Sequence, residues 1–231
     1  MSGFRPWGSL APAWARCSSA FVAALLSVGC GDDGGIIVPP PAGEATELVK
    51  ISGDAQVWYL NNALPAPYRV GARDANGLPV SGVSVNWAVT SGGGSVSPLV
   101  TVTDSVGTAT ATHSLGPTVG SQAASASATG LAAVEFGATA ATPPPSGAVS
   151  VGNDFFSPQN VVVRVNGTIT WTWNSGGTEH NVIYTSGPTP LPASSPTQDS
   201  GTFASTLSSV GRYQYVCTIH AGMEGTVTVV Q

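Results

Sequence analysis

Short segments in which β-branched or aromatic residues alternate with polar residues recur from about residue 46 to residue 231. A two-residue period places successive side chains on opposite faces of a sheet, and Val, Ile, Thr, Tyr and Trp favour strands. The evenly spaced segments of the first half are typical of a β-sandwich, with Trp87 in its core. The strands predicted there cover residues 47–52, 55–60, 68–74, 83–90, 99–104, 107–114, 121–128 and 133–140.

The periodicity stops at Thr-Pro-Pro-Pro-Ser-Gly, residues 142–147, which predicts a stiff linker between two domains. It resumes over 148–231, and the turn Val-Asn-Gly-Thr at 165–168 predicts a hairpin over 160–173. We therefore expect an all-β protein of two β-sandwich domains, 46–141 and 148–231. The strands predicted in the second domain cover residues 148–152, 160–165, 168–173, 180–185, 201–207, 211–217 and 225–230.

The first residues have the pattern of an export signal. Arg5 and Arg16 precede an apolar run over 20–29 that is too short to span a bilayer. Leu-Leu-Ser-Val-Gly-Cys resembles a bacterial lipobox, which implies a lipoprotein-type signal peptide over 1–29 and lipidation of Cys30. The alternative is a plain secretory peptide with an incidental cysteine.

The Gly- and Pro-rich residues 30–45 then predict a tether that holds the folded part away from a membrane. Together with the signal, this places the protein outside the cytoplasm, as a cell-envelope lipoprotein in the periplasm or on the outer membrane.

The charge of the chain argues against nucleic-acid binding. Only 8% of its 231 residues are charged and the formal net charge is −5. Removal of residues 1–29 would remove two arginines and no acid, changing the net charge to −7. No basic stripe is left to bind a phosphate backbone.

The candidate chemistry lies near the end of the second domain. Cys217 ends a predicted strand, His220 follows at Cys-x2-His spacing, and Met223 follows at His-x2-Met spacing. An unpaired cysteine in an exported protein needs a reason, and metal ligation is one. His180 is the other histidine of this domain. One thiolate, two imidazoles and one thioether are the ligands of a blue-copper site; the alternative is a chance Cys-x2-His beside a methionine that fills the core.

The second domain resembles the plastocyanin/azurin family of cupredoxins, on His180 with Asn181, the Cys-x2-His-x2-Met spacing and the Gly-Thr-Val-Thr-Val that follows. The spacing is similar to the short ligand loop of amicyanins, although Ile219 stands where many members carry proline. The resemblance implies a Greek-key sandwich and one type 1 copper held by His180, Cys217, His220 and Met223. It also implies that Asn181 braces the ligand loop near the thiolate.

The first domain resembles bacterial immunoglobulin-like domains of the invasin/intimin type, on residues 68–97 and 103–116. Such domains usually serve as spacers or adhesion stalks. His113 stands on a strand with no acid or second ligand near it in the sequence, so we expect a histidine that is hydrogen-bonded within the fold or exposed to solvent, rather than a site.

These patterns predict a non-catalytic protein that is tethered to a membrane by lipid and carries one electron at a time outside the cytoplasm. Three histidines are too few for a second copper centre, and no Ser-His-Asp arrangement is found. The expected partner is a redox protein, a cytochrome or an oxidoreductase. Two alternatives stay open: copper storage or delivery without electron transfer, and adhesion or surface architecture led by the first domain.

Overall fold

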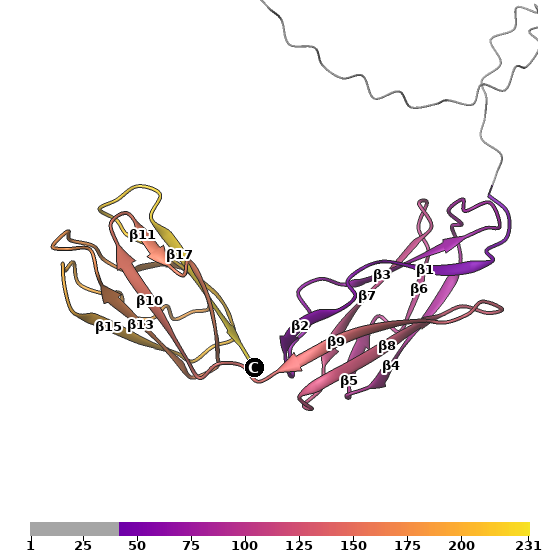
Figure 1. Ribbon diagram of the computed structural model, residues 1–231, viewed down its shortest axis with the longest axis horizontal. Helices are drawn as coiled ribbons and strands as arrows, with labels where there is room; N and C mark the ends of the chain where they lie inside the picture. Colours follow the sequence, from indigo (N-terminus) through magenta and orange to yellow (C-terminus); the bar gives the residue numbers. More distant parts are fainter. Residues whose placement is uncertain (1–41) are drawn as a thin grey trace, which may run out of the picture. The chain divides into compact units, whose positions relative to one another are not determined.

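The computed structural model describes residues 42–231, and these form strands, turns and loops without an α-helix (Figure 1). The predicted signal peptide, the lipidation candidate Cys30 and most of the predicted tether lie outside the described residues. Within the described residues, no helix is long and apolar enough to cross a membrane.

Two sheets form the first half. The four-stranded sheet has the order β1-β3-β7-β5 and the five-stranded sheet has the order β2-β9-β8-β4-β6. The bounds are β1 Glu47–Ser52, β2 Gln56–Tyr59, β3 Tyr68–Arg73, β4 Ser84–Ser91, β5 Gly94–Ser97, β6 Val100–Val102, β7 Thr108–Leu115, β8 Gly120–Ser127 and β9 Val134–Ala141.

Two further four-stranded sheets, β11-β10-β13-β15 and β12-β17-β16-β14, form the second half and share no strand with the first. The bounds are β10 Ser146–Gly152, β11 Phe155–Ser157, β12 Asn160–Arg164, β13 Gly167–Trp173, β14 Ile183–Ser186, β15 Thr202–Leu207, β16 Gly211–Val216 and β17 Glu224–Val230. The predicted linker overlaps this half, because β10 begins at Ser146.

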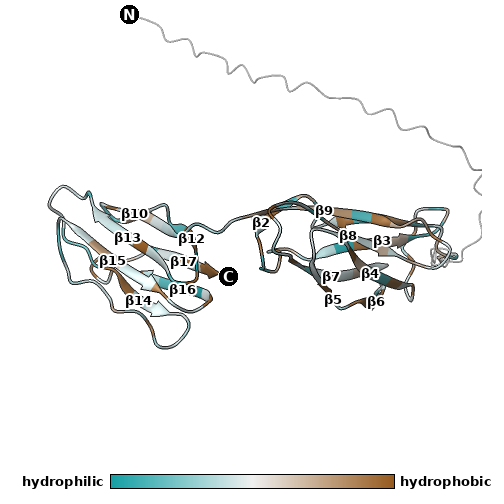
Figure 2. Cartoon of the chain, turned by 90° about the horizontal axis from the view of Figure 1, so that it is seen from below, coloured by the Kyte–Doolittle hydropathy of each residue, from teal (hydrophilic) through white to brown (hydrophobic). Residues whose placement is uncertain are grey.

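Each half has its own hydrophobic core, as two β-sandwiches require. Tyr68, Trp87 and Phe136 are buried in the first, and Trp171 and Tyr215 in the second. The cause is the two-residue period: along β13 every second residue is buried. Hydropathy accordingly changes residue by residue along strands such as β9 (Figure 2). The all-β prediction is confirmed.

The predicted hairpin over 160–173 is wrong. Asn166 has the positive φ of a tight turn, but the chain passes there from one sheet to the other. β12 pairs in parallel with β17, and β13 pairs with β10 and β15. Each strand finds a partner far away in the sequence, so a turn motif alone could not reveal the pairing.

Candidate metal centre

The loop from Cys217 to Met223 joins two antiparallel neighbours, β16 and β17. Their last paired residues are Val216 and Glu224, so the loop starts and ends at the same sheet edge. The Cys217 amide donates to the Met223 carbonyl at 2.9 Å, and the Met223 amide to the His220 carbonyl at 3.3 Å. Gly222 supplies the left-handed conformation, with φ of 81°, that the tight turn needs. The loop is therefore closed by its own backbone.

His180 reaches the same place from the segment before β14. The sequence predicts a strand from residue 180, but β14 begins at Ile183 and His180 forms an isolated bridge with Gln198. Two backbone hydrogen bonds hold that bridge, at 2.9 and 3.0 Å. The indole of Trp173 donates to the His180 carbonyl at 3.2 Å. The histidine is thus fixed by the opposite sheet and by the long loop before β15, not by a strand.

The side chains of Cys217, His180 and His220 converge at one place. The Cys217 Sγ lies 3.8 Å from the His180 Nδ1 and 3.6 Å from the His220 Nδ1. One sulfur and two nitrogens, one from each residue, all lie within 4.8 Å of one another. Metal–sulfur and metal–nitrogen bonds of about 2.3 and 2.0 Å that meet at 120° separate the two ligand atoms by about 3.7 Å. The observed separations fit ligands that share one ion in a trigonal arrangement.

Burial suits this group to a metal. Cys217 and His180 are buried, and His220 is partly exposed. Burial lowers the pKa of His180, the nearby His220 lowers it further, and Asp154 opposes both effects. A lowered pKa keeps this imidazole neutral, which is the form that binds metal.

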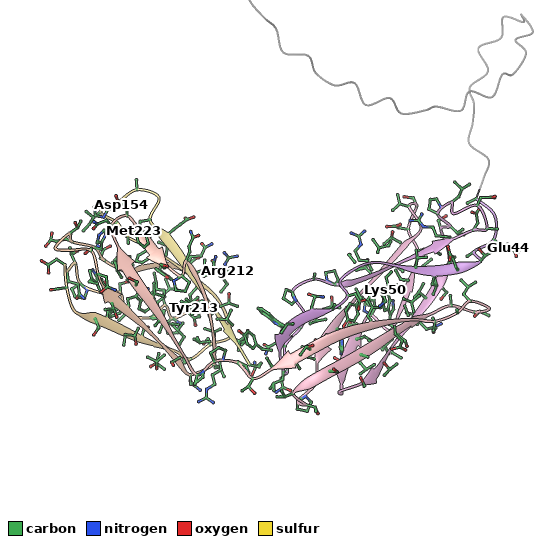
Figure 3. The ribbon with its side chains drawn as sticks, in the orientation of Figure 1. Glu44, Lys50, Asp154, Arg212, Tyr213 and Met223 are labelled. Carbon is green, nitrogen blue, oxygen red and sulfur yellow. The ribbon has the colours of Figure 1, made fainter. Side chains whose placement is uncertain are left out.

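Met223, the predicted fourth ligand, is buried at the end of the loop. It lines the same hollow as Cys217 and His220. Figure 3 shows it at the end of the second sandwich where Asp154 also lies, whereas Arg212 stands farther along β16. The loop therefore brings the thioether to the end of the sandwich that holds the other three candidates.

Asn181 ties the two segments of the site together. Its Oδ1 accepts the Thr218 amide at 2.9 Å, and its Nδ2 donates to the Thr218 hydroxyl at 2.8 Å. The same Nδ2 lies 3.2 Å from the hydroxyl of Thr197. Because Thr218 directly follows Cys217, these bonds fix the position of the cysteine relative to His180.

Three supporting residues were not among the predicted site residues. Trp173 lies in β13, and its indole holds His180. Thr218 carries no signal of its own, and Asp154 approaches His220 from a turn 66 positions earlier in the chain. An acid in a Gly-Asn-Asp turn is common, so only the folded structure reveals that contact.

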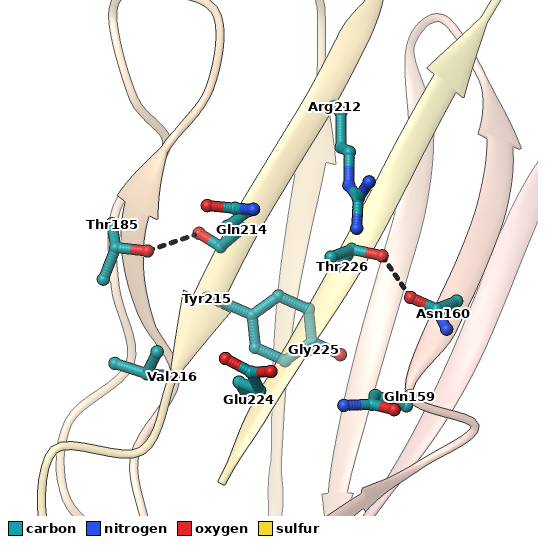
Figure 4. Close-up of a pocket in the computed structure, with 10 residues that line it drawn as sticks. All are labelled: Gln159, Asn160, Thr185, Arg212, Gln214, Tyr215, Val216, Glu224, Gly225 and Thr226. Atoms are coloured by element: carbon teal, nitrogen blue, oxygen red, sulfur yellow. Dashed lines mark hydrogen bonds between the residues drawn. The ribbon is translucent and has the colours of Figure 1, made fainter. Parts of the chain in front are cut away.

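A separate polar hollow lies on the outer face of the β12-β17-β16-β14 sheet (Figure 4). Hydrogen bonds from Thr185 to the Gln214 carbonyl and from Thr226 to the Asn160 side chain cross it. The four predicted ligand residues are not among those that line it. The hollow is therefore distinct from the metal centre.

Residues 148–230 match the model of a family described as copper binding proteins, plastocyanin/azurin family. No curated protein matches the chain significantly. A solved structure titled "Novel Purple Cupredoxin from Nitrosopumilus maritimus" is 26% identical, covering 36% of this chain and 98% of that one, with a TM-score of 0.33. The reduced state of an amicyanin mutant is 28% identical, covering 36% and 81%, with a TM-score of 0.32.

The family match and the site together define a class of domain. Residues 148–230 form a cupredoxin domain, and the His–Cys–His group lies at the end of the domain that carries the ligand loop. The family is one of copper-binding proteins, which agrees with the predicted copper cofactor. The match covers the second half of the described residues.

Proposed function

We propose that this protein is a type 1 copper protein that carries one electron at a time. The convergence of Cys217, His180 and His220 within 4.8 Å is the observation that carries the proposal. Met223 would complete the ligand set with a thioether sulfur. Copper bound there supplies a centre that gains and loses one electron.

The chain's own residues prepare the site for that task. Cys217 would hold copper as a thiolate and both histidines would hold it as neutral rings, so loading would release protons. The backbone bonds of the loop and the Asn181–Thr218 contacts would hold the ligands in place in both oxidation states of bound copper. A fixed ligand set needs little rearrangement when the charge of the ion changes, which favours rapid transfer. Among the three converging residues, the partly exposed His220 offers the contact with solvent and partners.

We further propose that the carrier works outside the cytoplasm. The export signal over 1–29, the lipobox-like Cys30 and the tether over 30–45 support a lipid anchor in the cell envelope. The sandwich before the cupredoxin domain then acts as an immunoglobulin-like spacer. The partner is a redox protein, a cytochrome or an oxidoreductase. Because one copper centre transfers electrons without transforming a substrate, the protein is not an enzyme.

Storage or delivery of copper uses the same ligands, so electron exchange separates the two functions. Stopped-flow mixing of the reduced protein with an oxidised cytochrome should give rapid exchange under the carrier proposal. Stable copper binding without any exchange would favour storage. Surface binding by metal-free protein would instead favour the adhesion alternative.

The first test is a titration of the purified chain with Cu(II), followed by ascorbate. We expect an intense blue band from the thiolate–copper bond that bleaches on reduction and returns on oxidation. The Cys217→Ser variant should lose the band, and the Asp199→Asn variant, changed at an exposed position, should keep it. A pale spectrum in the unmodified protein, or a blue Cys217→Ser protein, would contradict the assignment.

A further inference from the structure

Asp154 approaches the metal centre from outside the ligand loop. It stands in the turn between β10 and β11, where it adopts a positive φ of 63°. The turn is packed closely, because a Cβ on Gly152 would lie only 2.4 Å from the ring of Phe155. The carboxylate Oδ1 of Asp154 lies 3.8 Å from the His220 Nε2. The side chain of Asp154 is thus beside the one converging residue that reaches the surface.

The two nitrogens of His220 face different surroundings. Nδ1 lies 3.6 Å from the Cys217 sulfur, and Nε2 faces the carboxylate. A ring that binds metal through Nδ1 carries its proton on Nε2, so the carboxylate stands on the proton-bearing side. At 3.8 Å the contact is an electrostatic one between the carboxylate and the ring N–H rather than a hydrogen bond.

His180 has no such neighbour at its outer nitrogen. Its Nε2 is buried and makes no hydrogen bond within residues 42–231. The outer nitrogen of His220 therefore faces a carboxylate, whereas the outer nitrogen of His180 faces the core. The spacing of the ligands in the sequence does not show this difference. A negative charge beside a ligand stabilises the more positive state of the metal.

One other acid lies close by and offers a comparison. Glu224 follows Met223, is exposed, and lines the same hollow of about 190 Å³ as Asp154. Among the described residues, no ion-pair contact joins Glu224 to a histidine. The two acids thus carry equal charge at the same end of the domain, and Asp154 is the one paired with a ring.

We propose that Asp154 is a positioning residue that orients the His220 ring and lowers the reduction potential of the bound copper. The proposal rests on the proposed function for its redox part. Its structural part concerns only the contact between the carboxylate and the ring, so each part has its own measurement.

The redox test compares the midpoint potentials of the copper-loaded full chain and three variants at one neutral pH. Asp154→Asn should raise the potential, because it removes the charge and keeps the shape of the side chain. Glu224→Gln removes an equal charge without a ring contact and should raise it by less. Asp154→Glu keeps the charge and should restore most of the original value. Equal shifts in Asp154→Asn and Glu224→Gln, or no shift in Asp154→Asn, would overturn the proposal.

The structural test uses zinc in place of copper, so that no electron transfer is involved. Exchange of the His220 ring N–H proton with water is followed by nitrogen-15 NMR. Exchange should be faster in Asp154→Asn than in the original protein and unchanged in Glu224→Gln. Equal exchange in all three proteins would overturn the proposal. A further outcome is a copper-loaded protein that lacks the blue colour while the zinc-loaded protein still shows slow exchange of the His220 ring proton. That result would contradict the proposed function and leave the Asp154–His220 contact supported.

Discussion

At the scale of single residues, we expect Met223 to affect the reduction potential of the site more than its affinity for copper. Replacing the buried thioether in Met223→Gln supplies an amide oxygen, a harder ligand that favours Cu(II) over Cu(I). We expect the variant to keep its copper and to show a lower reduction potential by voltammetry. An unchanged potential would mean that the thioether is not a ligand. Ile219→Val, at an exposed position of the same loop, is the control and should leave the potential near its original value.

His113 carries a pH-dependent part of the stability. It is fully buried, its Nδ1 lies 3.1 Å from the Tyr68 hydroxyl, and its Nε2 has no hydrogen-bond partner among the described residues. Burial lowers its pKa below the ordinary 6.5, so between the two pKa values the unfolded chain binds a proton that the folded chain does not. The free energy of unfolding should therefore fall as the pH drops below about 6.5, by at most about 1.4 kcal/mol per pH unit for this group.

Urea unfolding of metal-free protein at a series of pH values measures that loss. His113→Leu should remove this contribution, so the difference between the two proteins should depend on pH below about 6.5 and be constant above it. Using the difference cancels the contribution of His180, whose pKa is also lowered. A difference that does not change with pH would show that His113 titrates normally.

At the scale of elements, the paired strands β16 and β17 hold the two ends of the ligand loop. Gly225 lies opposite Tyr215, and a Cβ at residue 225 would lie 2.4 Å from the buried tyrosine ring. Gly225→Ala should therefore destabilise the protein by about 1–3 kcal/mol, as overpacked core positions do. Denaturant unfolding of the zinc-loaded protein measures the change. Thr228→Ala, on the same strand, is the control; an equally stable Gly225→Ala would mean that the ring moves aside freely.

The sequence predicted most elements but not their partners. The alternation of residues located β13 and β16, because burial of every second side chain is a local property. The parallel pairing of β12 with β17 joins residues 66 positions apart and leaves no local trace. For the same reason, the ligand loop could be found from its Cys-x2-His-x2-Met spacing, whereas the approach of Asp154 could not.

At the scale of the whole molecule, the two halves have separate cores and no common strand. Each sandwich should therefore fold by itself. Deletion of residues 46–141 should leave the copper spectrum and the midpoint potential of the second half unchanged. The full-length protein measured in parallel is the reference. A lost or shifted spectrum would show that the copper domain depends on the first half.

The burial of Cys217 has a consequence for the protein before it meets copper. Only 4% of this residue is exposed. An oxidising compartment converts accessible thiols to sulfenic acids or to disulfides with other molecules, and access limits both reactions. A thiol covered by its own fold escapes them until a small ion reaches it. If the protein works outside the cytoplasm as proposed, its metal-free form should keep this thiol reduced until copper arrives, so a slow supply of metal should not lead to irreversible oxidation.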